Sequence, residues 1–257
     1  MIKAVFLDID GTMVSFETHC VPDNTKDALR EVRKKGVKVF VATGRHSSDI
    51  INLGDLEFDG YITLNGAYCK IGNEVVFKKS MPRDIIEAFV RYETETAPIP
   101  CFFVEADRVT ANMTDELMDQ MMALVKFPPR PVFPSKENID KEIFQMSAFF
   151  PIEREAEIMK RLPGCTTTRW YPTFTDINAI GVDKSVGLSK IGDYFGFSID
   201  EMMAFGDGGN DISMIKYAGT GVAMGNAGEE VKLAADYITT SVDDDGIGNA
   251  LRHFGVL

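Results

Sequence analysis

The sequence predicts an α/β protein whose parallel sheet is interrupted by an inserted α+β module. Short apolar runs that suit buried strands alternate with amphipathic helices near both ends of the chain. From about Pro82 the pattern changes, and helices that alternate with strands and hairpins indicate a separate α+β module over residues 82–181. Polar loops follow several of the apolar runs, and ligands of open parallel sheets bind outside the carboxyl ends of the strands. These loops therefore indicate a binding site.

Length and composition narrow the function classes. The chain has 257 residues, a net charge of -12 and a pI near 4.8, which argue against nucleic acid as a main partner because phosphate backbones need Lys and Arg. No apolar run is long enough to span a membrane, and no signal peptide is expected. The cysteines are scattered without a CxxC pair, at Cys20, Cys69, Cys101 and Cys165. We expect a cytoplasmic protein with no membrane partner, and a monomer by default.

The first apolar run, Ala4 to Leu7, ends at two carboxylates. Asp8 and Asp10 are spaced i, i+2, so in an extended chain they share a face and can converge. Two unpaired carboxylates beside a buried strand are unfavourable without a cation or another partner. An Asx-type turn at a strand end explains the same residues. This stretch alone leaves both interpretations open.

A βαβ unit follows. Pro22 with Asp23 or Asn24 begins a helix that stops at Gly36, and Val37 to Ala42 forms the second strand. Such a unit is expected to be right-handed.

The second strand ends at Thr43-Gly44-Arg45, with Ser47 and Ser48 placed to cap a further helix. A hydroxyl, a glycine and an arginine before a helix N-terminus suit an oxyanion. A plain βα turn is the alternative.

The third strand, Tyr61 to Leu64, ends at Asn65, and Tyr68 to Lys78 predicts a hairpin that turns at Gly72-Asn73. The α/β alternation returns with a helix from Asp183 to Phe195. Further strands are then expected at Glu201 to Phe205, Thr220 to Ala223 and Tyr237-Ile238, and a helix at Gly246 to Phe254 closes the chain. We therefore predict a core formed by residues 1–81 and 182–257, with residues 82–181 as a separate module.

The strand-end loops should meet at one edge of this sheet. They carry Asp8 and Asp10, Thr43 and Arg45, and Asp207, Asn210 and Asp211, with Lys184 at a neighbouring helix start. Such a group is balanced in charge only when a cation and an anion are both present. Mg²⁺ suits the carboxylate side, and phosphate suits the hydroxyl, amide and ammonium side.

Together these residues resemble the four signature motifs of the haloacid dehalogenase-like superfamily of phosphatases. The motifs are Asp8-Ile9-Asp10-Gly11-Thr12, Thr43 in Ala-Thr-Gly-Arg, Lys184, and Gly206-Asp207-Gly208-Gly209-Asn210-Asp211. Three further stretches resemble the Cof-type sugar phosphatase branch with a type IIB cap: Asn65-Gly66-Ala67, Gly181-Val182-Asp183-Lys184 and Asp243-Asp244-Asp245-Gly246. The resemblance covers the whole core, whereas the cap matches in size and position more than in residues.

The resemblance implies a Rossmann-like, doubly wound core with a cap domain that selects the substrate. It further implies that Asp8 is the nucleophile and that Asp10 first protonates the leaving oxygen and then activates water. Thr43, Gly44, Lys184 and Asn210 would bind phosphate or substrate, and Asp211 would orient groups around the site. Mg²⁺ would be bound by Asp8, the Asp10 backbone carbonyl and Asp207.

Some polar residues allow two interpretations. Arg45 either reaches the phosphate or pairs with a nearby carboxylate. Asn65 and Asp176, together with Asn178, are candidate substrate contacts, although turn formation explains the last two as well. His19 and His46 are expected at the surface.

The leading hypothesis is a Mg²⁺-dependent phosphatase that acts on a small phosphorylated metabolite, with hexose phosphates first. A phosphotransferase of the phosphomannomutase type shares the aspartyl-phosphate step and is the alternative. A protein that binds phosphate ligands without catalysis is a further alternative, but the intact motifs argue against it.

Overall fold

A computed structural model describes the backbone of residues 1–257 and all side chains except those of Val125 and Trp170. No α-helix in this described part of the chain combines the length and apolar character that a membrane crossing requires.

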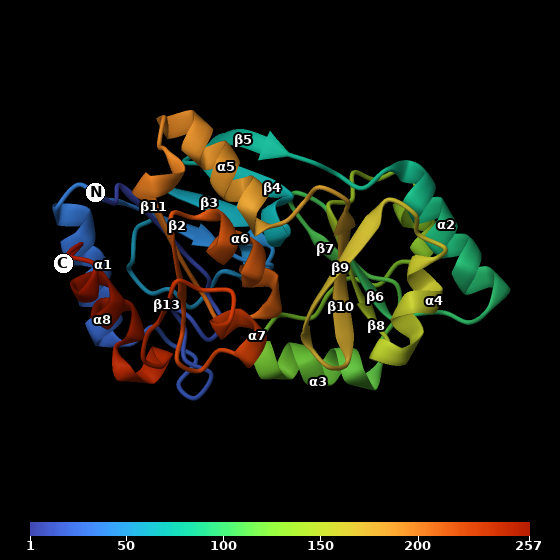
Figure 1. Ribbon diagram of the computed structural model, residues 1–257. Helices are drawn as coiled ribbons and strands as arrows, with labels where there is room; N and C mark the ends of the chain where they lie inside the picture. Colours follow the sequence, from blue (N-terminus) through green and yellow to red (C-terminus); the bar gives the residue numbers. More distant parts are fainter. The chain divides into compact units, whose positions relative to one another are not determined.

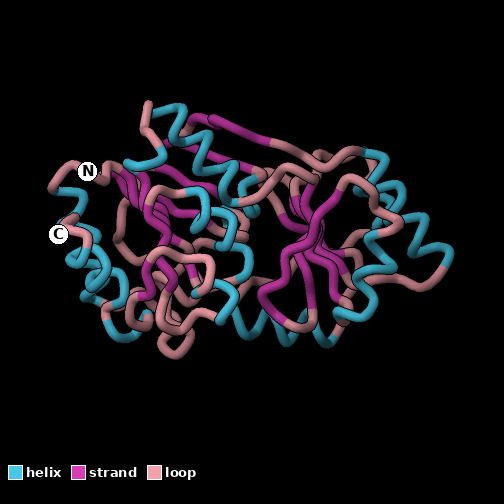
Figure 2. The backbone as a smooth tube through the Cα atoms, in the orientation of Figure 1, coloured by secondary structure: helices cyan, strands magenta, loops and turns pink.

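The chain folds into two compact units (Figures 1 and 2). Unit 1 comprises Met1–Arg45, Ile50–Lys78 and Asp183–Leu257, and unit 2 comprises His46–Asp49 and Lys79–Val182. Unit 2 thus includes a short segment that directly follows the Thr43-Gly44-Arg45 loop.

Unit 1 is built on a sheet with the strand order β13-β12-β11-β1-β2-β3-β4-β5. Its strands are β1 (Ala4–Leu7), β2 (Lys38–Ala42), β3 (Gly60–Thr63), β4 (Tyr68–Ile71), β5 (Glu74–Lys78), β11 (Met202–Gly206), β12 (Thr220–Ala223) and β13 (Tyr237–Ile238). Pairing is parallel from β13 to β3, and β3, β4 and β5 pair antiparallel. The carboxyl ends of β1, β2 and β11 therefore lie at the same edge.

Helices cover both faces of this sheet. Alternate residues of β1 point to opposite faces. Val5 and Leu7 pack in the core with α1 (Asp23–Lys34) and α8 (Gly246–His253). Phe6 packs in the core with α5 (Lys184–Phe195) and α6 (Ile212–Tyr217). A short helix, α7 (Glu229–Lys232), precedes β13. The predicted doubly wound α/β architecture is confirmed.

Unit 2 contains an antiparallel sheet in the order β7-β6-β8-β10-β9. Its elements are α2 (Arg83–Glu95), β6 (Cys101–Val104), β7 (Val109–Ala111), α3 (Glu116–Val125), β8 (Gln145–Phe149), α4 (Glu155–Met159), β9 (Cys165–Tyr171) and β10 (Phe174–Ala179). One face packs against α2 and α4, through residues such as Phe89 and Ile158. The other packs against α3, through Met118 and Met121.

One local prediction about helix starts is wrong. Ser47 and Ser48 do not cap an α-helix, because only a single 3₁₀ turn, Ser47–Asp49, forms there. The Ser48 hydroxyl instead contacts His46 Nδ1 at 2.8 Å and donates to Asp49 at 3.3 Å. The Thr43-Gly44-Arg45 loop therefore lacks the helix N-terminus that was expected to favour an anion.

Candidate active site

The centre of the site is a buried ion pair between Asp8 and Lys184. Asp8 directly follows β1, and Lys184 is the first residue of α5. The helix starts here because the Asp183 carboxylate accepts a hydrogen bond from Val186 N at 3.1 Å, as an N-cap should. Lys184 is 0% exposed and Asp8 is 6% exposed, with 2.6 Å between Lys184 Nζ and Asp8 Oδ1.

The loop after β11 supplies two more carboxylates. Lys184 Nζ also donates to Asp211 Oδ1 at 2.5 Å. Asp211 Oδ2 accepts from the backbone N–H groups of Asp207 and Gly208, both at 2.9 Å, so both Asp211 oxygens have protein partners. Asp211 therefore shapes this loop and orients Lys184.

Burial and mutual repulsion make the ionised form of these carboxylates unfavourable. Burial raises the pKa of Asp8 to about 7, and the charge of Asp211 adds to this, while Lys184 opposes it. Burial also raises the pKa of Asp207 well above its usual range, with Asp8 and Asp211 acting in the same direction. Burial alone would lower the pKa of Lys184, but the charges of Asp211 and Asp8 outweigh it and raise that pKa. Three carboxylates thus share one ammonium.

The residues of this group fit a hard cation. Oxygen atoms of Asp8, Asp207 and Asp211 all lie within 4.8 Å of one another. Carboxylate oxygens are the ligands that Mg²⁺ prefers, and a cation would offset the charge that makes ionised Asp8 and Asp207 unfavourable. Because Asp211 is fully engaged, Asp8 and Asp207 are the better direct ligands.

Asp10 and Arg45 form a second ion pair at the same edge. Arg45 Nε and Nη2 contact the two Asp10 oxygens at 2.8 and 2.5 Å, in a forked arrangement. Arg45 Nη1 also donates to Asn52 Oδ1 at 3.2 Å. Of the two interpretations of Arg45, the structure thus shows pairing with a carboxylate.

The loops after β2 and β3 are joined to each other and to the β11 loop. Thr43 is buried, and its hydroxyl accepts from Arg45 N at 3.1 Å. Asn65 N donates to Thr43 O at 3.1 Å, and Asn65 Oδ1 accepts from Asn210 Nδ2 at 3.0 Å. Asn65 has φ of 52°, which asparagine tolerates better than most residues. Asn65 and Asn210 therefore bridge two strand ends.

Gly66 explains how the Asn65 turn approaches α5. Its φ is +95°, and a Cβ there would collide with the backbone carbonyl of Asp183, which precedes Lys184. Glycine is thus required for this close approach.

Two further residues surround Asp207 and were missed as site residues by the sequence interpretation. Thr12 Oγ1 donates to Asp207 Oδ1 at 2.8 Å. Asn226, in the loop after β12, donates to Gly11 O at 2.8 Å and lies 3.5 Å from Asp207 Oδ2. Thr12 belongs to the quoted first motif, whereas an asparagine beside glycine after a strand predicts only a turn.

Other candidates lie in unit 2. Asp176 and Asn178 are buried within β10, so their interpretation as turn residues is wrong. Asp176 Oδ1 accepts from Ser147 Oγ at 2.6 Å, and Asn178 Nδ2 lies 3.3 Å from Gln145 Oε1. They belong to a hydrogen-bonded row across the sheet of unit 2.

His46 is also in unit 2 and is 5% exposed, so its expected surface position is wrong. Its Nε2 lies 3.2 Å from Ala106 O, and burial lowers its pKa. Nearby, Asp49 forms a buried ion pair with Arg130.

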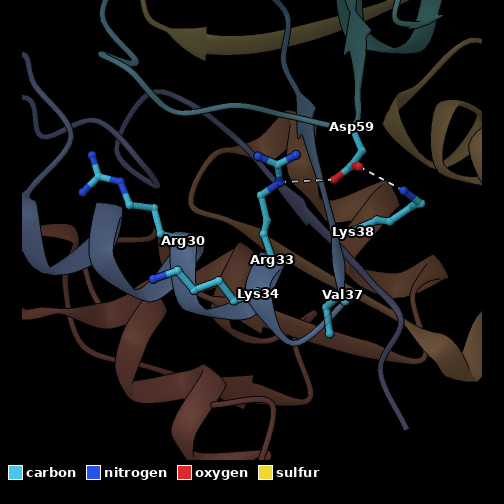
Figure 3. Close-up of a pocket in the computed structure, with 7 residues that line it drawn as sticks. Arg30, Arg33, Lys34, Val37, Lys38 and Asp59 are labelled. Carbon is cyan, nitrogen blue, oxygen red and sulfur yellow. Dashed lines mark hydrogen bonds and ion pairs between the residues drawn. The ribbon is translucent and has the colours of Figure 1, made fainter.

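A separate pocket lies where α1 ends and β2 begins (Figure 3). Its basic lining consists of Arg30, Arg33, Lys34 and Lys38. Arg33 and Lys38 both point to Asp59, at 3.6 and 3.0 Å. Cations also stabilise the C-terminal end of a helix. The pocket is at the amino end of β2, away from the Asp8 edge, and its charges stabilise α1.

Comparisons with known proteins agree with this geometry. A family model described as haloacid dehalogenase-like hydrolase matches residues 5–251. A solved structure, the HAD subclass IIB sugar phosphatase BT4131, is 43% identical, with a TM-score of 0.95 and coverage of 99% of this chain and 100% of that chain.

Two proteins of Bacillus subtilis are each 32% identical to this chain. The putative phosphatase YkrA aligns over 262 residues, which are 99% of this chain and 98% of that protein. The 5-amino-6-(5-phospho-D-ribitylamino)uracil phosphatase YcsE aligns over 263 residues, 98% of this chain and 96% of that protein.

The chain belongs to the haloacid dehalogenase-like hydrolases. Within that family it is a phosphatase of subclass IIB.

Proposed function

We propose that this phosphatase hydrolyses small phosphomonoesters, hexose phosphates first among them, with Mg²⁺ and through a phosphorylated Asp8. The observation that carries the proposal is the buried Asp8–Lys184 ion pair beside Asp207 and Asp211. A sugar phosphatase among the similar structures and a relative named for a phosphorylated ribityl compound support a polyhydroxylated leaving group.

The proposed reaction has two steps. An Asp8 oxygen forms a bond to phosphorus while the ester P–O bond breaks, and Asp10 gives a proton to the leaving oxygen. Asp10 then takes a proton from water, the water oxygen attacks phosphorus, and the bond to Asp8 breaks to release phosphate. Thr43 and Lys184 would bind the phosphoryl oxygens as their charge changes.

The metal would be bound by Asp8, Asp207 and the backbone carbonyl of Asp10. When bound, Mg²⁺ would neutralise the repulsion between the Asp8 carboxylate and an anionic substrate.

The Asp10–Arg45 pair suits the second step. Both Asp10 oxygens accept hydrogen bonds from Arg45, as in the carboxylate form that takes a proton from water. A proton on one oxygen would displace one of the two Arg45 donors. The first step therefore needs a partial opening of this pair.

Hydrolysis of p-nitrophenyl phosphate tests the proposal. Activity should require Mg²⁺ and be lost in Asp8→Asn, while acid-quenched wild-type enzyme should carry phosphate on Asp8 in mass spectrometry. Asp193→Asn is a matched control, because Asp193 is an exposed carboxylate on α5. Full activity in Asp8→Asn would exclude Asp8 as the nucleophile.

A panel of phosphate esters then tests the class of reaction and substrate. Hexose 6-phosphates should yield free sugar and phosphate. A hexose 1-phosphate that yields the 6-phosphate isomer would instead show a phosphotransferase. Ligand-dependent thermal stabilisation without turnover of any ester would show a binding protein.

A further inference from the structure

Asn226 joins three loops at the carboxyl edge of the unit 1 sheet. Its Nδ2 donates to Gly11 O at 2.8 Å and lies 3.5 Å from Asp207 Oδ2. Its Oδ1 accepts from Val242 N at 3.0 Å. One exposed side chain thus contacts the loops after β1 and β11 and the segment that precedes α8.

The orientation of the Asn226 amide follows from these partners. Gly11 O can only accept a hydrogen bond, and Val242 N can only donate one. A flipped amide would place two oxygens together at Gly11 and two N–H groups together at Val242. The NH₂ group of Asn226 therefore faces Gly11 and Asp207.

Asp207 has a side chain of another loop beside each of its oxygens. Thr12 Oγ1 donates to Oδ1 at 2.8 Å, and Asn226 Nδ2 lies beside Oδ2. Gly11 has φ of +80°, and a Cβ there would collide with the Asp207 carboxylate, so the first loop packs directly against this side chain. Asn226 secures that close approach by binding the carbonyl of Gly11.

We propose that Asn226 is a positioning residue that sets the affinity of the site for its divalent cation, by fixing the Asp207 carboxylate against the Gly11 loop. The inference rests on the proposed function, since it concerns the Mg²⁺ that Asp8 and Asp207 would bind. Partners that orient metal ligands typically change metal affinity by about 10- to 100-fold when removed.

Asn226→Ala and Asn226→Leu test the proposal, the second because it keeps most of the side-chain volume. Calorimetric titration of the metal-free protein with MgCl₂ should show Kd raised about tenfold in both. Activity towards p-nitrophenyl phosphate should fall at limiting Mg²⁺ and largely recover at saturating Mg²⁺.

Asn249→Ala is the matched control. Asn249 Nδ2 donates to Thr240 Oγ1 at 2.9 Å and to Asp244 O at 3.0 Å, so it stabilises the segment that also contains Val242. We expect the control to keep the wild-type Kd for Mg²⁺.

Three outcomes would overturn the inference. These are an unchanged Mg²⁺ Kd in both Asn226 variants, an equal rise in Asn249→Ala, or a fall in kcat that saturating Mg²⁺ does not restore. All three assume wild-type protein that binds Mg²⁺. Wild-type protein that takes up no Mg²⁺ in calorimetry would overturn the proposed function and this inference together.

Discussion

The two units bury polar side chains in different ways. In unit 1, the Lys184 ammonium group contacts Asp8 and Asp211, and Asp207 lies close to both of these carboxylates. In unit 2, the buried polar row on the α3 face of the sheet contains one acidic side chain, Asp176, and otherwise neutral groups that hydrogen-bond to one another. The unit 1 group has excess negative charge, whereas the polar atoms of the unit 2 row largely have hydrogen-bond partners.

This difference leads us to expect catalysis in unit 1 and recognition of the leaving group in unit 2. Burial, with the charge of Asp211 added to it, raises the pKa of Asp8 to about 7. The ionised site is therefore unfavourable without a metal, and a cation would stabilise it. A hydrogen-bonded row with a single carboxylate, that of Asp176, has no such requirement for a cation, and its polar atoms suit hydroxyl groups of a ligand. We therefore expect substitutions in unit 1 to affect turnover and those in unit 2 to affect substrate preference.

Lys184→Met should have the largest effect. It leaves Asp8 and Asp211 buried without their shared cation, which should lower the free energy of unfolding by about 3–5 kcal/mol. It also removes the proposed donor to the phosphoryl oxygens, which should lower kcat by about a thousandfold. Urea unfolding and p-nitrophenyl phosphate hydrolysis measure the two effects.

Lys190→Met is the control for that substitution. Lys190 is on the same helix, but its side chain is partly exposed. Its Nζ lies 3.9 Å from the Asp193 carboxylate, a longer and weaker contact than those of Lys184. Its removal should change stability by less than about 1 kcal/mol. Equal stability of the two variants would contradict the proposed charge imbalance in unit 1.

Arg45→Ala should have the next largest effect. Without its forked partner, Asp10 loses the two contacts that fix its carboxylate, and kcat should fall about 100-fold. The kcat of Arg45→Lys should lie between those of the wild type and Arg45→Ala, because an ammonium group keeps the charge but cannot make the same two-point contact. Arg33→Ala, which removes a surface arginine paired with Glu57, is the control. Unchanged kcat in Arg45→Ala would remove Arg45 from the site.

The arrangement of unit 1 could be predicted because parallel strands align their carboxyl ends. Asp8, Thr43 and Asp207 each follow an apolar run, so the sheet alone places them together. Contacts that depend on side-chain direction could not be predicted. The Arg45–Asp10 pair and the position of Asn226 are set by rotamers and loop geometry. The spacing of apolar residues in the sequence carries no information on either.

Unit 2 was harder to interpret because its polar residues are buried. Asp176 and Asn178 alternate with Thr175 and Ile177 in β10, and Asp and Asn are residues that favour turns and are depleted in strands. Burial of His46 likewise depends on contacts with Ala106, distant in sequence. Long-range partners of this kind leave no local pattern.

The pH dependence of Mg²⁺ binding should show a smaller effect, of about tenfold. The pKa of Asp8 is about 7 in the folded protein and 3.8 ordinarily, so its ionised form destabilises the fold increasingly from about pH 4 to pH 7. Mg²⁺ must compete with the proton below pH 7, and its Kd should be about tenfold weaker at pH 6 than at pH 8.

Thermal unfolding with and without Mg²⁺ measures this difference. Melting-temperature shifts should be larger at pH 8, and the metal-free protein should lose stability as pH rises to 7. Lys190→Met should keep the wild-type profile. A Mg²⁺ effect independent of pH would mean that Asp8 is ionised throughout this range.

Asp176→Asn should have the smallest effect and tests the comparison from the side of unit 2. Asparagine keeps the shape and can still accept the hydrogen bond from Ser147, so stability should change by less than about 1 kcal/mol. The KM for a hexose 6-phosphate should rise about threefold to tenfold, because a hydroxyl donor loses a charged acceptor. Hydrolysis of p-nitrophenyl phosphate, which lacks those hydroxyls, should be unchanged.

Ser147→Ala sharpens this result, because it removes one hydrogen-bond donor to Asp176 but leaves the carboxylate in place. If Asp176 recognises the leaving group, this variant should alter hexose phosphate KM less than Asp176→Asn. If Asp176→Asn lost the same fraction of activity with both substrates, the polar row would only stabilise the sheet of unit 2. Selectivity would then have to come from other side chains, and the division between a catalytic unit and a recognition unit would fail at this residue.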